Sequence, residues 1–126
     1  MTSASEESPL VDTALANELF FPQGDEESDA MQRDIWLGIS RDLIPDLEAT
    51  VAGCLDAKDL RSELHRIRGY CATCALVRMS RFLHHWEMLD DPVGAAEKFG
   101  LEAAAIARES IREMDRTYPH LQVPPA

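Results

Sequence analysis

The chain has 126 residues, enough for one domain with a single hydrophobic core. Its formal net charge of −11 at pH 7 argues against nucleic-acid binding, because contact with a phosphate backbone needs a positive surface. It contains neither an apolar run of the roughly 18 residues that a membrane helix needs nor the basic and apolar blocks of a signal peptide, so we expect a cytoplasmic protein without membrane insertion.

The first segments predict a tail, a short helix and a loop. Residues 1–8 are polar and predict a disordered tail, and residues 8–20 predict a short helix that begins at a Ser-Pro pair and acts as a lid. Residues 22–28 combine turn formers with charges and predict a loop. Ser28 or Asp29 then offers a cap for the following helix.

A long core helix is predicted between residues 31 and 55. Its apolar residues recur at four-residue steps, as expected for one buried helix face: Met31, Ile35, Ile39, Leu43, Leu47 and Val51. This stripe is widened by Trp36, Ile44 and Leu55. Pro45 is expected to kink or split the helix, because its ring removes a backbone donor and clashes with the preceding turn.

Two further helices are predicted between residues 56 and 89. The first can begin at Asp56 or Asp59, and its buried face repeats at steps of three and four. The residues of this face are Leu60, Leu64, Ile67, Cys71 and Cys74. The apolar stripe then continues at a different phase, so we expect a bend or a short connection near residues 73–75.

The last predicted helix extends from about Pro92 to Thr117. Its inner face carries alanines, which allow close approach of a neighbouring helix, among larger residues: Ala96, Phe99, Ala103, Ile106, Ser110, Ile111 and Met114. Four long helices with short connections favour an all-α fold, an antiparallel four-helix bundle with a short extra N-terminal helix. The bundle is predicted over residues 9–118, followed by a C-terminal tail at 119–126.

The three cysteines, Cys54, Cys71 and Cys74, predict buried and inert thiols. Their odd number, in a chain without a secretory signal, argues against a disulfide framework. Cys71 and Cys74 match C-x-x-C, but they lie inside a predicted helix rather than at the exposed helix start that lowers a thiol pKa. His84 and His85 do not complete a zinc spacing with them, so no metal site is predicted.

Basic residues are concentrated in one part of this acidic chain. Six of the twelve lie between residues 58 and 81 and predict contact with a small anion or an acidic partner: Lys58, Arg61, Arg66, Arg68, Arg78 and Arg81. A helical wheel places His65 and Gly69 on the solvent face of their helix, together with Arg61, Ser62, Arg68 and Ala72. A glycine inside a helix costs about 1 kcal/mol relative to alanine, so its presence beside a histidine needs a reason.

The segment ELHRIRGYCATCALVRMSRFLHHWE, residues 63–87, resembles the signature of histidine-containing phosphotransfer (HPt) domains of two-component phosphorelays. The family pattern is a histidine, any residue, an apolar residue, a lysine or arginine and a glycine, followed by small residues and a second helix that often carries a glutamate. The residues in step with this pattern are His65, Ile67, Arg68, Gly69, Ala72, Leu76, Met79, Leu83 and Glu87. The resemblance covers residues 10–117 and agrees with the predicted bundle.

The resemblance implies that His65 is the phosphoacceptor, that Arg68 stabilises the transferring phosphoryl group and that Gly69 leaves steric access to it. A receiver domain would bring its aspartyl phosphate to the imidazole. The residues expected to bind this partner are Arg61, Ser62, Arg66 and Ala72. Expected partners are receiver domains of response regulators or hybrid sensor histidine kinases, and the protein itself is expected to be a monomer. No cofactor is expected, because Mg2+ would be held by the receiver.

The chain departs from the family pattern at two positions. Tyr70 stands where a small residue is usual, and Ala75 stands where a second glycine is common; both bear on partner choice. No glycine-rich phosphate loop is present, so the phosphoryl group has to arrive from another protein. We therefore expect a phosphoryl carrier with a phosphohistidine intermediate rather than an enzyme with its own kinase site.

Two other functions remain open at this point. The chain could be a helical adaptor that binds an acidic partner through the basic face of residues 61–68 without being phosphorylated. It could also sense redox state or metal through Cys54, Cys71 and Cys74. Replacement of His65 separates the adaptor from a phosphorelay, and a thiol titration with metal analysis tests the sensor.

Overall fold

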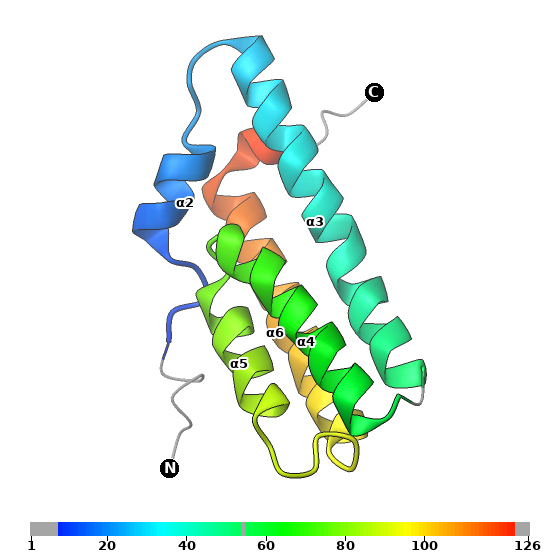
Figure 1. Cartoon of the computed structure of the whole chain (residues 1–126). Coiled ribbons are helices and arrows are strands. Elements are labelled where there is room, and N and C mark those ends of the chain that lie inside the picture. Colours follow the sequence, from blue (N-terminus) through cyan, green and yellow to red (C-terminus); the bar gives the residue numbers. More distant parts are fainter. Residues whose placement is uncertain (1–7, 54, 123–126) are drawn as a thin grey trace.

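The computed structural model describes residues 8–53 and 55–122. Its elements are α2 (Thr13–Phe20), α3 (Glu26–Ala52), α4 (Ala57–Thr73), α5 (Val77–Glu87), α6 (Ala96–Thr117) and the 3-10 helix η1 (Pro119–Leu121), as Figure 1 shows. No strand occurs in these described residues, so the predicted all-α class is confirmed. Of the predicted tails, residues 1–7 and 123–126 lie outside the described residues, whereas η1 lies within the second tail and buries Leu121.

Aspartates begin three of the helices. Asp12, Asp25 and Asp56 each accept a hydrogen bond from a backbone N–H of the first turn, at 3.2, 2.8 and 2.8 Å, which satisfies a donor that the helix leaves free. The predicted start at Asp56 is confirmed. The predicted caps Ser28 and Asp29 are wrong, because both lie in the first turn of α3. Acidic side chains in that turn are stabilised by the positive end of the helix dipole.

The segment before α2 is not helical, because α5 holds it in place. The carbonyl of Ser8 accepts a hydrogen bond from Arg78 at 2.7 Å, and its hydroxyl accepts one from Arg81 at 2.6 Å. The backbone N–H of Asp12 donates to the carbonyl of Ala75 at 2.8 Å. The first helix therefore begins later than predicted.

Two prolines lie in a different setting from the predicted one. α3 continues through Pro45 as one helix, so the predicted split is wrong; the proline is exposed, and water can bind the carbonyl that loses its donor. Pro92 does not begin α6, which starts at Ala96. Its carbonyl accepts a hydrogen bond from the buried indole N–H of Trp86 at 3.0 Å. This contact holds the α5–α6 connection against the core.

The four longer helices, α3 to α6, lie side by side and alternate in direction along the chain (Figure 1). α3 contacts α4 and α6, and α5 contacts the same two helices. Each of them therefore turns one face toward a common interior. α2 lies beside one end of this group, where Phe20 packs edge-on against the ring of Trp36 at a centroid distance of 6.0 Å.

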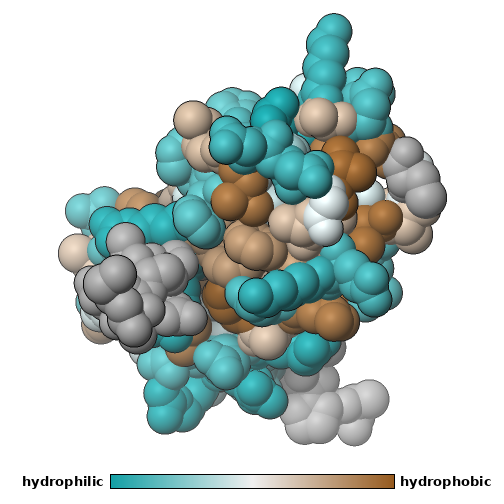
Figure 2. Space-filling view, turned by 90° about the horizontal axis from the view of Figure 1, so that it is seen from below, coloured by the Kyte–Doolittle hydropathy of each residue, from teal (hydrophilic) through white to brown (hydrophobic). Residues whose placement is uncertain are grey.

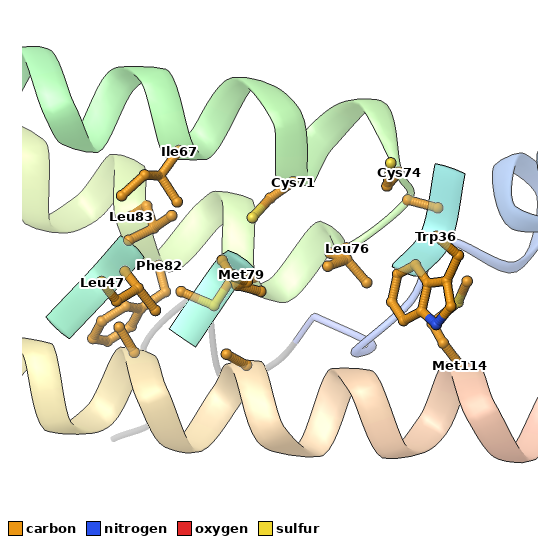
Figure 3. Packing of buried hydrophobic residues seen from close by; sticks show 14 of the residues in the cluster. Trp36, Leu47, Ile67, Cys71, Cys74, Leu76, Met79, Phe82, Leu83 and Met114 are labelled. Carbon is orange, nitrogen blue, oxygen red and sulfur yellow. The ribbon is translucent and has the colours of Figure 1, made fainter. Parts of the chain in front are cut away.

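Large apolar side chains fill the common interior (Figure 3), among them Leu47, Ile67, Leu76, Met79, Leu83 and Met114. The predicted stripe of α3 is buried at Leu43 but wrong near the start of the helix, where Met31 and Ile35 are 62% and 53% exposed. Trp36 takes the inward position there, and its indole N–H donates to Asp115 at 3.1 Å. The large ring, rather than the four-residue step, determines which face of α3 is buried.

The α4–α5 connection is a tight turn at the predicted place. Ala75 is buried there with a φ of 69°, in the left-handed region that favours glycine. Cys71, in the last turn of α4, and Cys74, which ends it, are buried free thiols, which confirms their predicted burial. Burial raises the pKa of Cys71 to about 12. Cys54 lies outside the described residues.

Apolar surface reaches the outside at the end where α3 meets α4. Figure 2 views the molecule from this end and shows apolar atoms at its centre, surrounded by polar ones. A pocket here is lined by Thr50, Val51, Leu55, Leu60, Val93, Ala96 and Glu97. Connections between helices cover the core less completely than helices do. None of the described helices combines the length and the apolar character needed to cross a membrane.

Candidate functional site around His65

α4 presents His65 on its outer surface. The apolar stripe of the helix faces the common interior, so the opposite side faces solvent. The His65 side chain is 66% exposed, and Ser62, Gly69 and Ala72 are also exposed. These four residues therefore lie on the solvent face, as predicted from the helical wheel.

His65 lies in a group of four side chains from two helices, here named the His65 cluster: His65 and Arg68 of α4 with His84 and Glu87 of α5. One terminal nitrogen of Arg68 is 2.6 Å from Nδ1 of His65, and the other is 3.0 Å from Nδ1 of His84. Oε1 of Glu87 is 3.4 Å from Nδ1 of His65, and Oε2 is 3.4 Å from Nε of Arg68. On each helix the two members are three residues apart, so they share a face.

Glu87 is the least accessible member of the cluster. Its side chain is 16% exposed and Oε2 is buried. A carboxylate in such a place needs a positive partner, and Arg68 lies within ion-pair distance. Arg61 also fixes the backbone here, because it donates to the carbonyls of Glu87 and Leu89 at 3.1 and 3.0 Å. The end of α5 is thereby held beside His65.

The neighbours of Nδ1 determine which nitrogen of His65 can act as a nucleophile. Arginine has only hydrogen-bond donors, so Nδ1 must offer its lone pair when it is bonded to Arg68, and the proton of the neutral ring then resides on Nε2. When Nδ1 instead donates its proton to Glu87, Nε2 carries the lone pair. Competition between Arg68 and Glu87 for Nδ1 therefore controls the nucleophilic character of Nε2.

Gly69 lies beside His65 on the same face, and the fold does not require a glycine there. Its backbone is helical. Apart from its chain neighbours and the nearby backbone of its own helix, a Cβ added to it would meet no atom of the described residues within 4 Å. The missing side chain therefore leaves open surface next to the imidazole.

Arg66 and Tyr70 are engaged on the side of α4 that faces α3. Arg66 donates to both carboxylate oxygens of Asp46, at 2.7 and 3.0 Å, and to Glu63 at 2.6 Å. These hydrogen bonds hold the pKa of the Asp46 carboxyl below its usual value. The half-buried Tyr70 donates to the same carboxylate at 3.1 Å, and burial raises the pKa of its hydroxyl. The predicted partner-binding role of Arg61 and Arg66 stays a prediction, and both have acceptors within their own chain.

In the sequence, two members of the cluster are not predicted as site residues. Glu87 appears there only as part of the family pattern, and His84 only as a rejected zinc ligand. Their spacing of three residues on α5 is the available sequence signal. Which side of α5 faces His65, however, depends on the turn at Ala75. The sequence pattern does not show how this turn orients α5 relative to α4.

Within residues 8–53 and 55–122, no three His, Cys, Asp or Glu side chains are grouped so that they could hold a metal ion. The described side chains at His65 are instead two imidazoles, a guanidinium and a carboxylate. Comparisons with models of protein families, with curated proteins and with solved structures found no significant match to this chain. The geometry of the His65 cluster is therefore the basis on which the function of the chain is inferred.

Proposed function

We propose that this chain is a histidine-containing phosphotransfer protein that relays a phosphoryl group between receiver domains through His65. In this proposal α3 to α6 form an antiparallel four-helix bundle and α2 is the short extra helix. The observation that carries the proposal is an exposed imidazole whose Nδ1 lies between a guanidinium and a partly buried carboxylate. The open surface at Gly69 supports it as well.

The transfer step uses Nε2 of His65 as the nucleophile. Its lone pair attacks the phosphorus of the receiver's aspartyl phosphate, a P–N bond forms, and the P–O bond breaks with both electrons leaving on the aspartate carboxylate. The step starts from the tautomer with the proton on Nδ1, which forms when Arg68 releases Nδ1, so no proton is released during the transfer. The ring becomes positively charged, and Glu87, with Oε1 at 3.4 Å from Nδ1, balances that charge. The reverse step returns the phosphoryl group to a second receiver.

In this proposal Arg68 acts on the incoming phosphoryl group. Its guanidinium is held beside the ring that receives the phosphoryl group, and arginine binds phosphoryl oxygens through paired donors. As the anionic phosphoryl group attracts Arg68, Nδ1 becomes free to donate to Glu87. Charge on the phosphoryl oxygens and the correct tautomer of His65 are thus stabilised together.

The test is phosphotransfer from radiolabelled receiver domains, supplied with Mg2+, to the wild type, to His65→Gln and to His85→Gln. His85 is a matched control, because it lies between His84 and Glu87 in the sequence of α5 but stacks on Phe99 at a centroid distance of 5.9 Å. The wild type and His85→Gln should gain a phosphate that is labile in acid and stable in base, as expected for phosphohistidine. His65→Gln should gain none while its circular dichroism spectrum remains that of the wild type.

Two outcomes would overturn the proposal. Label on His65→Gln would place the phosphate on another residue. No label on any variant from a broad panel of receivers, with binding retained, would favour the adaptor over the phosphoryl carrier.

A further inference from the structure

His84 has a place in the His65 cluster that the transfer step above does not use. It lies on α5 one turn before Glu87, with its side chain 53% exposed. Its Nδ1 is 3.0 Å from a terminal nitrogen of Arg68 and 4.0 Å from Oε2 of Glu87. It is therefore in direct contact with the guanidinium and not with the nucleophile.

Arg68 has three acceptors in the cluster, and they hold different nitrogens. Its terminal nitrogens face His65 and His84, at 2.6 and 3.0 Å, while Nε faces Glu87 at 3.4 Å. Because arginine only donates, Nδ1 of His84 must present a lone pair to make this contact. The guanidinium of Arg68 therefore contacts both imidazoles and the carboxylate at the same time.

Without His84, the guanidinium would have a better alternative. Arginine and a carboxylate prefer a paired geometry in which two N–H groups meet both oxygens. A freed Arg68 can rotate into that geometry on Glu87, which is already within ion-pair distance. Oε1 of Glu87 would then be occupied and could no longer accept the proton of Nδ1 of His65.

We propose that His84 is a positioning residue for phosphotransfer: by accepting a hydrogen bond from Arg68, it keeps the guanidinium from closing on Glu87 and leaves Oε1 free for His65. This inference rests on the proposed function of His65. Until a phosphoryl group draws Arg68 away, its bond to Nδ1 keeps His65 as the Nε2–H tautomer; once Arg68 leaves Nδ1, the free Oε1 can accept the Nδ1 proton and Nε2 carries the lone pair.

The test compares His84→Leu with His84→Asn. Leucine removes the acceptor, whereas the amide oxygen of asparagine stands close to the position of Nδ1 and can still accept from Arg68. Long-range 1H–15N correlation spectra of the imidazole rings report the tautomer of His65. Labelling by phosphoramidate, a small phosphoryl donor, reports its reactivity without a protein partner.

We expect His84→Leu to shift His65 away from the Nε2–H tautomer, because a guanidinium that has closed on Glu87 no longer donates to Nδ1. Labelling should slow about tenfold, the effect of losing one hydrogen bond to a charged group. His84→Asn should resemble the wild type in both measurements. An unchanged tautomer and rate in His84→Leu would overturn the proposal, and so would an equal loss in both variants, which would indicate a packing role.

The proposed function can fail separately from this inference. If the wild type takes no phosphate from receivers or from phosphoramidate, His65 is not a phosphoacceptor. The tautomer of His65 in the two variants would still show whether His84 holds Arg68 away from Glu87, and an unchanged tautomer in His84→Leu would refute it.

Discussion

Replacing Gly69 by alanine should make the protein more stable and a poorer phosphoryl carrier. Glycine inside a helix is about 1 kcal/mol less favourable than alanine, and the added methyl group would meet nothing within 4 Å beyond its chain neighbours and the nearby backbone of its own helix, among the described residues. No packing strain offsets the gain, so the free energy of unfolding should rise by about 1 kcal/mol. For a domain of this size, that is roughly 4 °C in melting temperature.

The same methyl group would stand where a receiver has to approach His65. An extra carbon in a close-packed contact costs about 1–3 kcal/mol, which corresponds to a loss of roughly 5- to 150-fold in the rate of transfer from a receiver. Phosphoramidate needs no docked surface, so its labelling of Gly69→Ala should change little. The difference between the two donors separates steric access from chemistry at the imidazole.

Gly38 provides the matched control. It lies inside α3, is exposed, and has open space at its Cβ position in the described structure. Gly38→Ala should therefore gain a similar stability in thermal unfolding followed by circular dichroism, with transfer unchanged. A wild-type rate of receiver transfer in Gly69→Ala would refute the argument that this glycine provides access. A failure of Gly69→Ala to gain stability would refute the estimate from the open space.

Three further predictions concern stability and thiol reactivity. Arg66 holds the folded pKa of Asp46 below its unfolded value, so the pair stabilises the fold above about pH 4 and loses this effect as pH falls through the folded pKa. In urea unfolding, the free energy of unfolding of the wild type should exceed that of Asp46→Asn by an amount that falls between about pH 6 and about pH 3. A difference that stays constant over this range would contradict the lowered pKa of Asp46. Ala75→Gly should change the free energy of unfolding by less than about 1 kcal/mol, because relief of the left-handed backbone is offset by a lost methyl group and a freer unfolded chain. Ala72→Gly, at an exposed helix position, should cost about 1 kcal/mol; equal losses at the two positions would argue against the left-handed turn. Cys71, whose pKa burial raises to about 12, should react with a thiol reagent near neutral pH only after unfolding when the other two cysteines are replaced by serine, and rapid reaction of the native protein would refute its burial.

Helix-period patterns predicted α4 and α5 well because their stripes are regular and aspartate provides a start for α4. These patterns failed where two nearby residues were equally good candidates for the same role. Asp25 and Ser28 are both good caps, and the chain uses the earlier one. Ile35 and Trp36 are adjacent apolar residues, and the larger ring is buried because α2 and α6 provide partners for it. Such choices depend on tertiary contacts that a single-helix pattern does not contain.

The candidate site was predictable only where it lies on one helix. His65, Arg68 and Gly69 follow from spacing along α4, since residues three and four apart share a face. Glu87 and His84 come from α5, and their approach depends on the left-handed turn between the two helices. The sequence pattern of α4 also does not show that arginines on its solvent face form hydrogen bonds with acceptors on other helices.

Most of the basic residues between 58 and 81 form hydrogen bonds within their own chain, so the net charge of the protein bears on the rate at which a partner associates. Hydrogen bonds within the chain are made by Arg61, Arg66, Arg68, Arg78 and Arg81. At low ionic strength, where the Debye length reaches about 30 Å, an approaching partner meets mainly the net charge of −11. An acidic partner would be repelled on approach, so added salt should speed its association rather than slow it, the reverse of an electrostatically steered encounter. Discrimination between partners would then lie in how long a complex lasts after collision.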